Sequence, residues 1–561
     1  MSILTVLLLS LFVRVINLWE YNLEVQVKQG ILRGSERKTW GLRTYAAFEG
    51  IPYAEPPVGS RRFQPPVPAG AWEGVLDATK CGAFCPQRDV FVNNLTLVGN
   101  EDCLFLNVYT SKVNGNQLLP VIVYIHGGGF MTDSGDPNLY GPDILLDKDI
   151  VFVTMNYRLG ALGFLSLEDD VLSGNNGLKD QNLALQWVKS NIESFGGNPN
   201  KITIFGNSAG GASVYYHILS PLSEGLFHSA ISSSGIATAT WALAQNGEAK
   251  LNAQRLAQFL NCPITSSQAI VECLRKIDPN DIVKQNDKFM EFNYDPAIPH
   301  KPVIEPKHAG AFLTKHPMDI LKSGQFAHVP FMNGLTSNDG GLKSVSIYSN
   351  YSLVERLNKD FEYITPMVLH YDHHNSYKKI SRAVRKFYFQ DKAIDNDTKM
   401  ELTDLVTDAL FYYPQRVTSL LHAKYTKQPV YFYLFGYRGS VSISTLIGDA
   451  EHDYGAIHGD ELNYILSNSF FEDYKPTVSD LKMNEIMTTL WYNFANTGNP
   501  TPEHDTLIET KWERVEPDMF KYYLIGGVND IKMETNLFEH RFEFWDDLNI
   551  HFSSSNVKDE L

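Results

Sequence analysis

A serine flanked by glycines is the residue of this chain best suited to nucleophilic chemistry. Ser208 lies at the centre of Gly206–Gly210 (Gly-Asn-Ser-Ala-Gly), directly after the apolar run Ile202–Phe205. This pattern is typical of a sharp turn from a strand into a helix, which holds the serine exposed in a strained backbone conformation. The flanking residues must be small because strand and helix nearly touch there. The pattern predicts Ser208 as a nucleophile.

Three consecutive glycines predict a second part of the same site. Gly127–Gly129 follow Val121–Ile125, an apolar run that predicts a buried strand. Such glycines are costly to order, and a chain uses them where its backbone must approach a ligand closely. The amides of Gly128, Gly129 and Ala209 would form an oxyanion hole for a tetrahedral acyl intermediate. A flexible hinge is the alternative, but the order of strand, glycines and serine turn favours the oxyanion hole.

A serine hydroxyl needs a base, and His458 is the histidine we select for that role. It lies in the glycine-bounded loop Gly455–Gly459, after the aromatic run Pro429–Phe435, whereas His373 and His374 are interpreted as solvated. The third member must be a carboxylate between serine and histidine in chain order. Asp339, in the segment Gly334–Gly341, is the best candidate. An ordinary turn is the alternative interpretation of that glycine-rich segment.

The elements needed to position these residues indicate an α/β fold. The apolar runs predict strands, and Ala212, Tyr215 and Leu219 have the spacing of a helix that packs on a sheet. Further helices predicted at Gly247–Phe259, Leu353–Phe361 and Lys399–Thr418 would cap the active-site edge of the sheet. No linker, repeat or low-complexity tract divides the chain, so residues 23–552 are expected to form one domain.

Together these segments resemble the type-B carboxylesterase and cholinesterase family of α/β-hydrolases, from about Leu23 to about Trp545. Further stretches carry the resemblance: Phe48–Gly59, Glu101–Val108, Asn156–Gly160 and Asn176–Gln181. The resemblance implies the α/β-hydrolase fold, with a large, mostly parallel mixed sheet flanked by helices. It assigns the same residues as the chemistry does: nucleophile Ser208, acid Asp339, base His458, and oxyanion donors Gly128, Gly129 and Ala209.

Of three departures from the family pattern, two favour a carboxylesterase over a cholinesterase. Asn207 and Asp339 stand where the family usually has glutamate, and no tryptophan lies between Cys85 and Cys103. The site therefore lacks a negative charge beside the nucleophile and a cation–π platform for a quaternary ammonium. Aspartate serves as the acid in many hydrolase triads. Trp241 matches a position that walls the acyl pocket in relatives, with an ordinary buried aromatic as the alternative.

The resemblance also implies two disulfides. Relatives pair the equivalents of Cys85 with Cys103 and of Cys262 with Cys273, which leaves Cys81 over as a buried thiol or a competitor of Cys85. Disulfides fit an oxidising compartment. Asn94, Asn350 and Asn396 head N-x-S/T sequons and are expected to be glycosylated if exposed.

Both ends of the sequence predict residence in the endoplasmic reticulum lumen. Residues 1–22 contain a short apolar core that is typical of a secretory signal peptide, although no lysine or arginine precedes it. Residues 553–561 form a polar tail that ends in Lys558–Leu561 (Lys-Asp-Glu-Leu), the retrieval signal that the KDEL receptor binds. Some leakage to the medium is expected.

Composition excludes other classes of partner. The formal net charge of -16 gives no basic surface for nucleic acid or an anionic membrane. The sequence has no phosphate-binding glycine loop, no H-E-x-x-H pair and no C-x-x-C pair, so neither metal nor cofactor is expected. The predicted function is a serine carboxylesterase that acts on a small neutral ester. The alternatives are a lipase and a non-catalytic binding or adhesion relative on the same fold.

Overall fold

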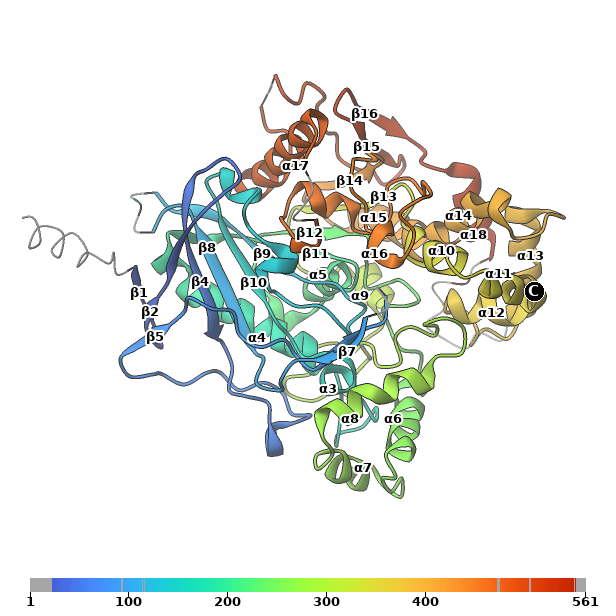
Figure 1. The fold of residues 1–561 in the computed structure, drawn as a ribbon, viewed down its shortest axis with the longest axis horizontal. Coiled ribbons are helices and arrows are strands. Elements are labelled where there is room, and N and C mark those ends of the chain that lie inside the picture. The colour runs from blue at the N-terminus through green and yellow to red at the C-terminus, as the bar shows by residue number, and fades with distance from the viewer. Residues whose placement is uncertain are drawn as a thin grey trace, which may run out of the picture.

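The computed structural model describes residues 23–91, 94–113, 115, 117–471, 475–503, 506–548 and 550. The predicted signal peptide (1–22) and C-terminal tail (553–561) lie outside the described residues. Figure 1 shows a central twisted sheet with helices packed around it.

An eleven-stranded sheet is the centre of the molecule. Its seven inner strands run parallel and its four outer strands antiparallel. In spatial order the strands are β16 (Asp530–Thr535), β15 (Lys521–Gly527), β14 (Val430–Phe435), β13 (Phe331–Thr336), β12 (Ser229–Ser233), β11 (Gly197–Asn207), β9 (Leu119–Ile125), β10 (Val151–Met155), β8 (Phe105–Thr110), β4 (Thr44–Pro52) and β3 (Ser35–Lys38). This arrangement confirms the predicted mixed, mostly parallel sheet.

Alternate residues of each strand point to opposite faces of the sheet, and both faces are buried in hydrophobic clusters. In β9, Val121, Val123 and Ile125 belong to one hydrophobic cluster and Ile122 and Tyr124 to the other. Helices α4 (Asn176–Asn191), α5 (Ala209–Leu219) and α15 (Tyr413–Tyr425) contribute to the first cluster, and α17 (Val478–Thr497) to the second.

The other helices lie around the sheet (Figure 1). They are α2 (Pro137–Tyr140), α3 (Gly160–Phe164), α6 (Glu248–Phe259), α7 (Ser267–Leu274), α8 (Pro279–Lys284), α9 (Pro317–Ser323), α10 (Gly341–Tyr348), α11 (Tyr351–Lys359), α12 (Phe361–Val368), α13 (Tyr377–Phe389), α14 (Lys399–Thr407), α16 (Ser444–Ile447) and α18 (Glu539–Leu548). Within the described residues, none of the helices is both long and apolar enough to cross a membrane.

Two small sheets complete the fold. Strands β1 (Glu24–Val27), β2 (Gly30–Arg33) and β5 (Val75–Asp77) form one, and β6 (Gln87–Asp89) and β7 (Asn94–Val98) form the other. The β6–β7 pair lies inside the segment bounded by Cys85 and Cys103.

Two of the predicted helices differ from the observed ones. The helix expected at Leu353–Phe361 ends at Lys359, and α12 begins at Phe361. The helix expected at Lys399–Thr418 continues to Tyr425, and a π turn at Asp408–Tyr412 separates α14 from α15. Single π turns inside helices are frequent at functional sites.

Candidate active site

The turn at Ser208 has the strained geometry that its sequence predicts. Ser208 follows β11 and precedes α5, with φ 60° and ψ -125°. A Cβ atom at Gly206 would lie 2.4 Å from the Gly210 carbonyl carbon, and one at Gly210 would lie 2.0 Å from the Ile125 carbonyl oxygen. Glycine is therefore required at both positions, because strand and helix meet there.

A buried histidine and carboxylate face each other after the next strands of the sheet. Asp339 follows β13, and His458 lies in a loop after β14, so both lie beyond the carboxyl ends of parallel strands. His458 Nδ1 lies 3.0 Å from Asp339 Oδ1, and Thr336 Oγ1 donates to the same carboxylate oxygen at 2.8 Å. The contact assigns the proton to Nδ1 and leaves Nε2 as the basic nitrogen. The backbone amide of Asn338 donates to Ala456 O at 3.0 Å and ties the two loops together.

Ser208, His458 and the glycine loop line one cavity of about 390 Å³. His458 Nε2 is buried and makes no hydrogen bond within the described residues. Catalytic hydrogen bonds are often long or poorly aligned until substrate binds. The cavity therefore brings the predicted nucleophile, the predicted base and the glycine loop together, with Asp339 in contact with the imidazole.

The glycine loop follows β9 and has an open backbone conformation. Gly128 and Gly129 have φ values of 79° and 60°. Tyr157 Oη donates to His126 O at 3.0 Å and stacks on the His126 ring at a centroid distance of 4.3 Å. Burial lowers the pKa of His126 to about 3, so that ring is neutral and supports the loop. Ala209 begins α5, where the first backbone N–H groups of a helix have no intrahelical partner.

Aromatic and aliphatic side chains form most of the cavity wall. Trp241 is buried there, and its indole N–H donates to Leu410 O at 2.9 Å. Leu410 and Phe411 come from the π turn, and the Phe411 ring lies 4.7 Å from the His458 ring. The sequence predicted Trp241 at the acyl pocket, but the helical pattern gave no signal for the π turn that positions Phe411.

A second carboxyl group near the triad was not predicted. Asn207 Nδ2 donates to Glu461 Oε1 at 3.0 Å, and both side chains are buried. Burial raises the pKa of Glu461 to about 8, and the nearby charge of Asp339 adds to the rise. Glu461 follows His458 by three residues, but this spacing alone does not indicate a contact with Asn207.

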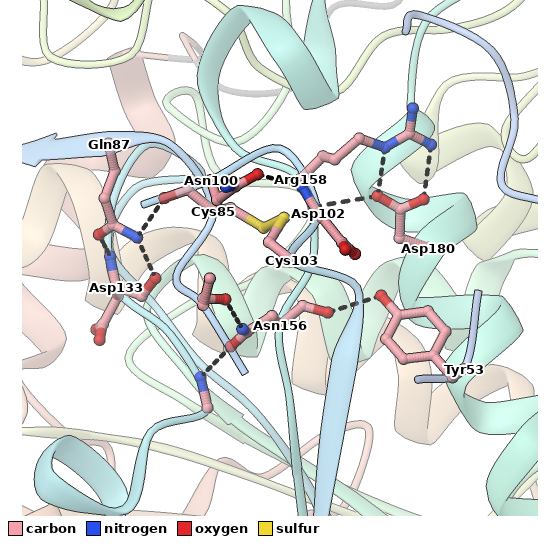
Figure 2. The surroundings of a disulfide bond; sticks show 12 residues. Tyr53, Cys85, Gln87, Asn100, Asp102, Cys103, Asp133, Asn156, Arg158 and Asp180 are labelled. Carbon is pink, nitrogen blue, oxygen red and sulfur yellow. Dashed lines mark hydrogen bonds and ion pairs between the residues drawn. A yellow bond between two sulfur atoms is a disulfide. The ribbon is translucent and has the colours of Figure 1, made fainter. Parts of the chain in front are cut away.

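The structure contains both disulfides that the resemblance implied. Cys85 pairs with Cys103 and Cys262 with Cys273, while Cys81 is a free thiol whose pKa is raised by burial. Figure 2 shows the first disulfide beside a buried ion pair in which Arg158 Nε donates to Asp180 Oδ2 at 2.7 Å. This ion pair joins two of the segments that carry the family resemblance.

Two of the three predicted glycosylation sites have exposed side chains. Asn350 and Asn396 are exposed, and the side chain of Asn94 lies outside the described residues. In the part of the chain that the structure describes, no three His, Cys, Asp or Glu side chains are grouped so that they could hold a metal ion.

Comparisons with known proteins show which family the chain resembles over its length. A model of the Carboxylesterase family matches residues 22–545. The chain is 37% identical to a carboxylic ester hydrolase of Bombus ignitus, over 94% of each chain. It is also 37% identical to the juvenile hormone esterase of Tribolium castaneum, over 86% of this chain and 84% of that protein.

A solved structure shares the fold. The crystal structure of juvenile hormone esterase from Manduca sexta, with OTFP covalently attached, superposes with a TM-score of 0.84 at 28% identity. The match covers 94% of this chain and 99% of that one. The prediction of a carboxylesterase-like α/β-hydrolase is confirmed: the chain belongs to the carboxylesterase family and is a carboxylic ester hydrolase.

Proposed function

We propose that the protein hydrolyses neutral carboxylic esters through an acyl-enzyme formed on Ser208. The observation that carries this proposal is the buried His458–Asp339 pair, whose imidazole shares one cavity with Ser208 and the glycine loop. Serine, histidine and carboxylate in this chain order are the parts of a hydrolase triad.

In the proposed reaction, His458 Nε2 takes the proton of Ser208 as Oγ attacks the ester carbonyl carbon. The amides of Gly128, Gly129 and Ala209 stabilise the negative charge that develops on the carbonyl oxygen. His458 then donates the proton to the leaving alcohol and activates a water that hydrolyses the acyl-enzyme. Asp339 holds the imidazole in the required tautomer throughout.

Two features support neutral esters as the substrate class. Asn207 places an uncharged amide beside the nucleophile, and the carboxyl group that it contacts, Glu461, has its pKa raised to about 8 by burial. Aromatic and aliphatic groups such as Trp241, Leu410 and Phe411 form the wall around Ser208. An apolar wall with few polar groups suits an uncharged acyl chain.

The test is a nitrophenyl-ester assay across acyl lengths, with Ser208→Ala beside the native enzyme and organophosphate labelling mapped by mass spectrometry. We expect a burst of nitrophenol, a label on Ser208 alone, and loss of both in the variant. A native protein that gives no burst and takes no label would contradict the acyl-enzyme proposal and favour a non-catalytic binding role.

A lipase remains the second candidate, because the exposed side chain of Phe470 joins the apolar wall of the cavity. The same assay separates the two candidates. Activity that rises sharply above the solubility limit of long-chain esters would favour a lipase, whereas saturation below that limit would favour a carboxylesterase.

We further propose that the protein resides in the endoplasmic reticulum lumen, where the KDEL receptor retrieves it. The Lys558–Leu561 sequence, the apolar leader and the two disulfides support this location. Glycosylation at Asn350 and Asn396, both exposed, belongs to the same proposal, and removal of N-glycans should lower the mass of the native protein.

A further inference from the structure

Asp133 is a carboxylic acid in a backbone conformation that favours glycine. It follows the glycine loop, has a φ of 87°, and lines the same cavity as Ser208. A side chain in this region of φ is uncommon outside glycine, asparagine and aspartate, and strained residues cluster at functional sites. The strained backbone at Asp133 indicates a functional role for its carboxyl group in the cavity.

The position of Asp133 is fixed from both sides of its backbone. Asp133 N donates to Gln87 Oε1 at 2.5 Å, and Gln87 Nε2 donates to Asp133 O at 2.9 Å. We call these two hydrogen bonds the Gln87 clamp. Gln87 Nε2 also donates to Cys85 O at 3.1 Å, so the clamp is attached to the segment between Cys85 and Cys103 (Figure 2). The Gln87 side chain therefore fixes the backbone from which the Asp133 carboxyl group projects.

Asp133 lies against the predicted oxyanion loop. The Asp133 Cβ atom is 2.9 Å from the point that a Cβ on Gly128 would occupy. Gly128 is one of the proposed donors to the reacting carbonyl oxygen. Ser208 and Asp133 therefore line one cavity, with the proposed oxyanion loop beside Asp133.

The carboxyl group receives hydrogen bonds but no positive charge from the protein. Ser134 N donates to Asp133 Oδ1 at 2.9 Å and Tyr140 Oη donates to Oδ2. Within the described residues no lysine, arginine or histidine forms an ion pair with Asp133, and Asp89 lines the same cavity. Asp133 is half-buried, and a carboxylate withdrawn from water without a cation is costly unless further donors reach it. Each carboxylate oxygen can accept more than the one bond it has.

The titratable groups that interact with Asp133 are the carboxyl group of Asp89 and three phenols. Burial raises the pKa values of Tyr124, Tyr140 and Tyr157 far above neutrality, so these groups stay uncharged. Burial raises the pKa of Asp133 to about 7, and the charge of Asp89 adds to the rise. The carboxyl group thus ionises within the range in which esterase activity is measured.

We propose that Asp133 is a specificity-determining residue that accepts a hydrogen bond from an O–H or N–H group on the ester substrate. The preferred substrates are then neutral esters that carry a hydroxyl a few bonds from the scissile carbonyl. This inference rests on the proposed function and names a substrate class within it. Asp133 selects the substrate and takes no part in the acyl transfer.

The test compares esters matched in size, with the donor on either side of the scissile bond. On the alcohol side these are propyl, hydroxypropyl and dimethylaminopropyl butanoate; on the acyl side they are methyl hexanoate and its terminally hydroxylated form. The readout is the ratio of kcat/KM for the donor ester to that for the unsubstituted ester. This ratio cancels changes in the triad, which acts on both esters.

Three variants make the test specific. Asp133→Asn keeps the shape of the side chain, and Asp133→Gly relieves the strain of the positive φ. The control, Asp102→Asn, changes an exposed carboxyl group in the segment between Cys85 and Cys103. We expect Asp133→Gly to lower the donor preference about tenfold, mainly through KM, since a hydrogen bond to a charged group is worth that much. Asp133→Asn should lower it less, because the neutral amide oxygen still accepts, but more weakly. Asp102→Asn should leave the ratio unchanged. Asp133→Gly should unfold at no lower temperature than the native protein.

The pH dependence of the ratio provides a second readout. Because ionised Asp133 is the stronger acceptor, the donor preference of the native enzyme should rise between pH 6 and pH 8.5, and it should be flat in both Asp133 variants. Preference for the hydroxyl ester supports the proposal, whereas preference for the ammonium ester alone would contradict the neutral substrate class. A ratio that Asp133→Asn and Asp133→Gly leave unchanged in both series would overturn it, while continued hydrolysis of the unsubstituted esters would leave the proposed function standing.

Discussion

Two buried carboxyl groups lie near His458, and the geometry assigns them different roles. Asp339 contacts the imidazole directly, at 3.0 Å, whereas Glu461 contacts Asn207. A triad acid must be ionised to stabilise the imidazolium that forms during acyl transfer. Burial raises the pKa of Glu461 to about 8, so Glu461 is largely protonated at pH 7 and is unsuited to that role.

Substitution of each carboxyl group by its amide tests this assignment. Asp339→Asn should lower kcat by about four orders of magnitude, because the amide favours the wrong tautomer of the imidazole. Glu461→Gln, the matched control, should change kcat far less at pH 7. Steady-state kinetics on one nitrophenyl ester measures both, and circular dichroism checks that each variant folds. The reverse order of effects would identify Glu461 as the acid.

The raised pKa of Glu461 also predicts how the free energy of unfolding changes with pH. Its pKa in the folded protein, about 8, lies above the value of an unperturbed glutamate, about 4.3. Between these two values the unfolded chain is ionised while the folded one keeps the proton, so the favourable contribution present at low pH is lost as pH rises toward 8. Glutamine does not titrate and avoids this loss.

Glu461→Gln should therefore gain stability relative to the native protein as pH rises from 5 to 8. Each pH unit in that window adds at most about 1.4 kcal/mol to the difference in unfolding free energy. Denaturant titrations of both proteins at the two pH values measure it. A difference that stays constant, or shrinks with pH, would show that Glu461 is already ionised in the folded state.

A single added methyl group tests the oxyanion loop. Gly128 has a φ of 79°, and a Cβ there would lie 2.2 Å from Thr132 O, so Gly128→Ala must displace the backbone. We expect kcat to fall by a factor of 10² to 10³, the usual effect of losing one oxyanion donor. Gly527→Ala is the control, since a Cβ at Gly527 meets no atom within 4 Å. Equal kcat values for the two variants would place the oxyanion hole elsewhere.

Short sequence patterns predicted the role of individual residues, but they did not predict which distant residues contact one another. Ser208 and Gly128 carry short-range signals, because the turn and the open loop need glycine at fixed offsets. The Asn207–Glu461 contact joins residues 254 positions apart, and no local pattern encodes it. Asp133 stands out only once its φ is known, since aspartate is common in ordinary turns.

At the scale of elements, the segment that contains β6 and β7 forms part of the wall of the substrate cavity. Gln87, Phe91 and Val98, all between Cys85 and Cys103, line the substrate cavity. The second disulfide closes the α6–α7 region, whose residues pack in a separate hydrophobic cluster. None of the described cavity-lining residues comes from that region.

Removing each disulfide separately should distinguish these roles. Each double Cys→Ser variant should lose about 3 kcal/mol of unfolding free energy by the loop-closure estimate. Loss of Cys85–Cys103 should also raise KM, because the Gln87 clamp loosens, whereas loss of Cys262–Cys273 should leave KM unchanged. Denaturation curves and ester kinetics on the same samples provide the comparison. A raised KM in the second variant alone would contradict this division.

The strands and the helix after Ser208 followed from sequence because their apolar patterns are continuous. The predicted Val121–Ile125 lies within β9, and the predicted helix from Ala212 to Leu219 lies within α5. The breaks at Asp360 and at the π turn were missed. Both depend on how neighbouring helices pack, and the π turn in particular places Leu410 beside Trp241.

At the scale of the whole molecule, the parallel sheet explains why residues so far apart in sequence form one site. Gly128, Ser208, Asp339 and His458 follow β9, β11, β13 and β14, and the carboxyl ends of parallel strands lie at the same edge. The sequence predicts this convergence once the strands and their order are known. It does not predict the shape of the cavity, which depends on side chains from distant loops and helices.

The proposed location is a property of the whole chain and is tested on the whole chain. Deleting Lys558–Leu561 should release the protein into the medium of secretory cells, because the KDEL receptor then has no signal to bind. The described residues that line the cavity all precede this segment, so the secreted protein should have native kcat and KM. A variant with the last leucine replaced, Leu561→Ala, disturbs only the signal and should behave like the deletion. If both variants stay inside the cell with native activity, another feature of the chain determines where the enzyme resides.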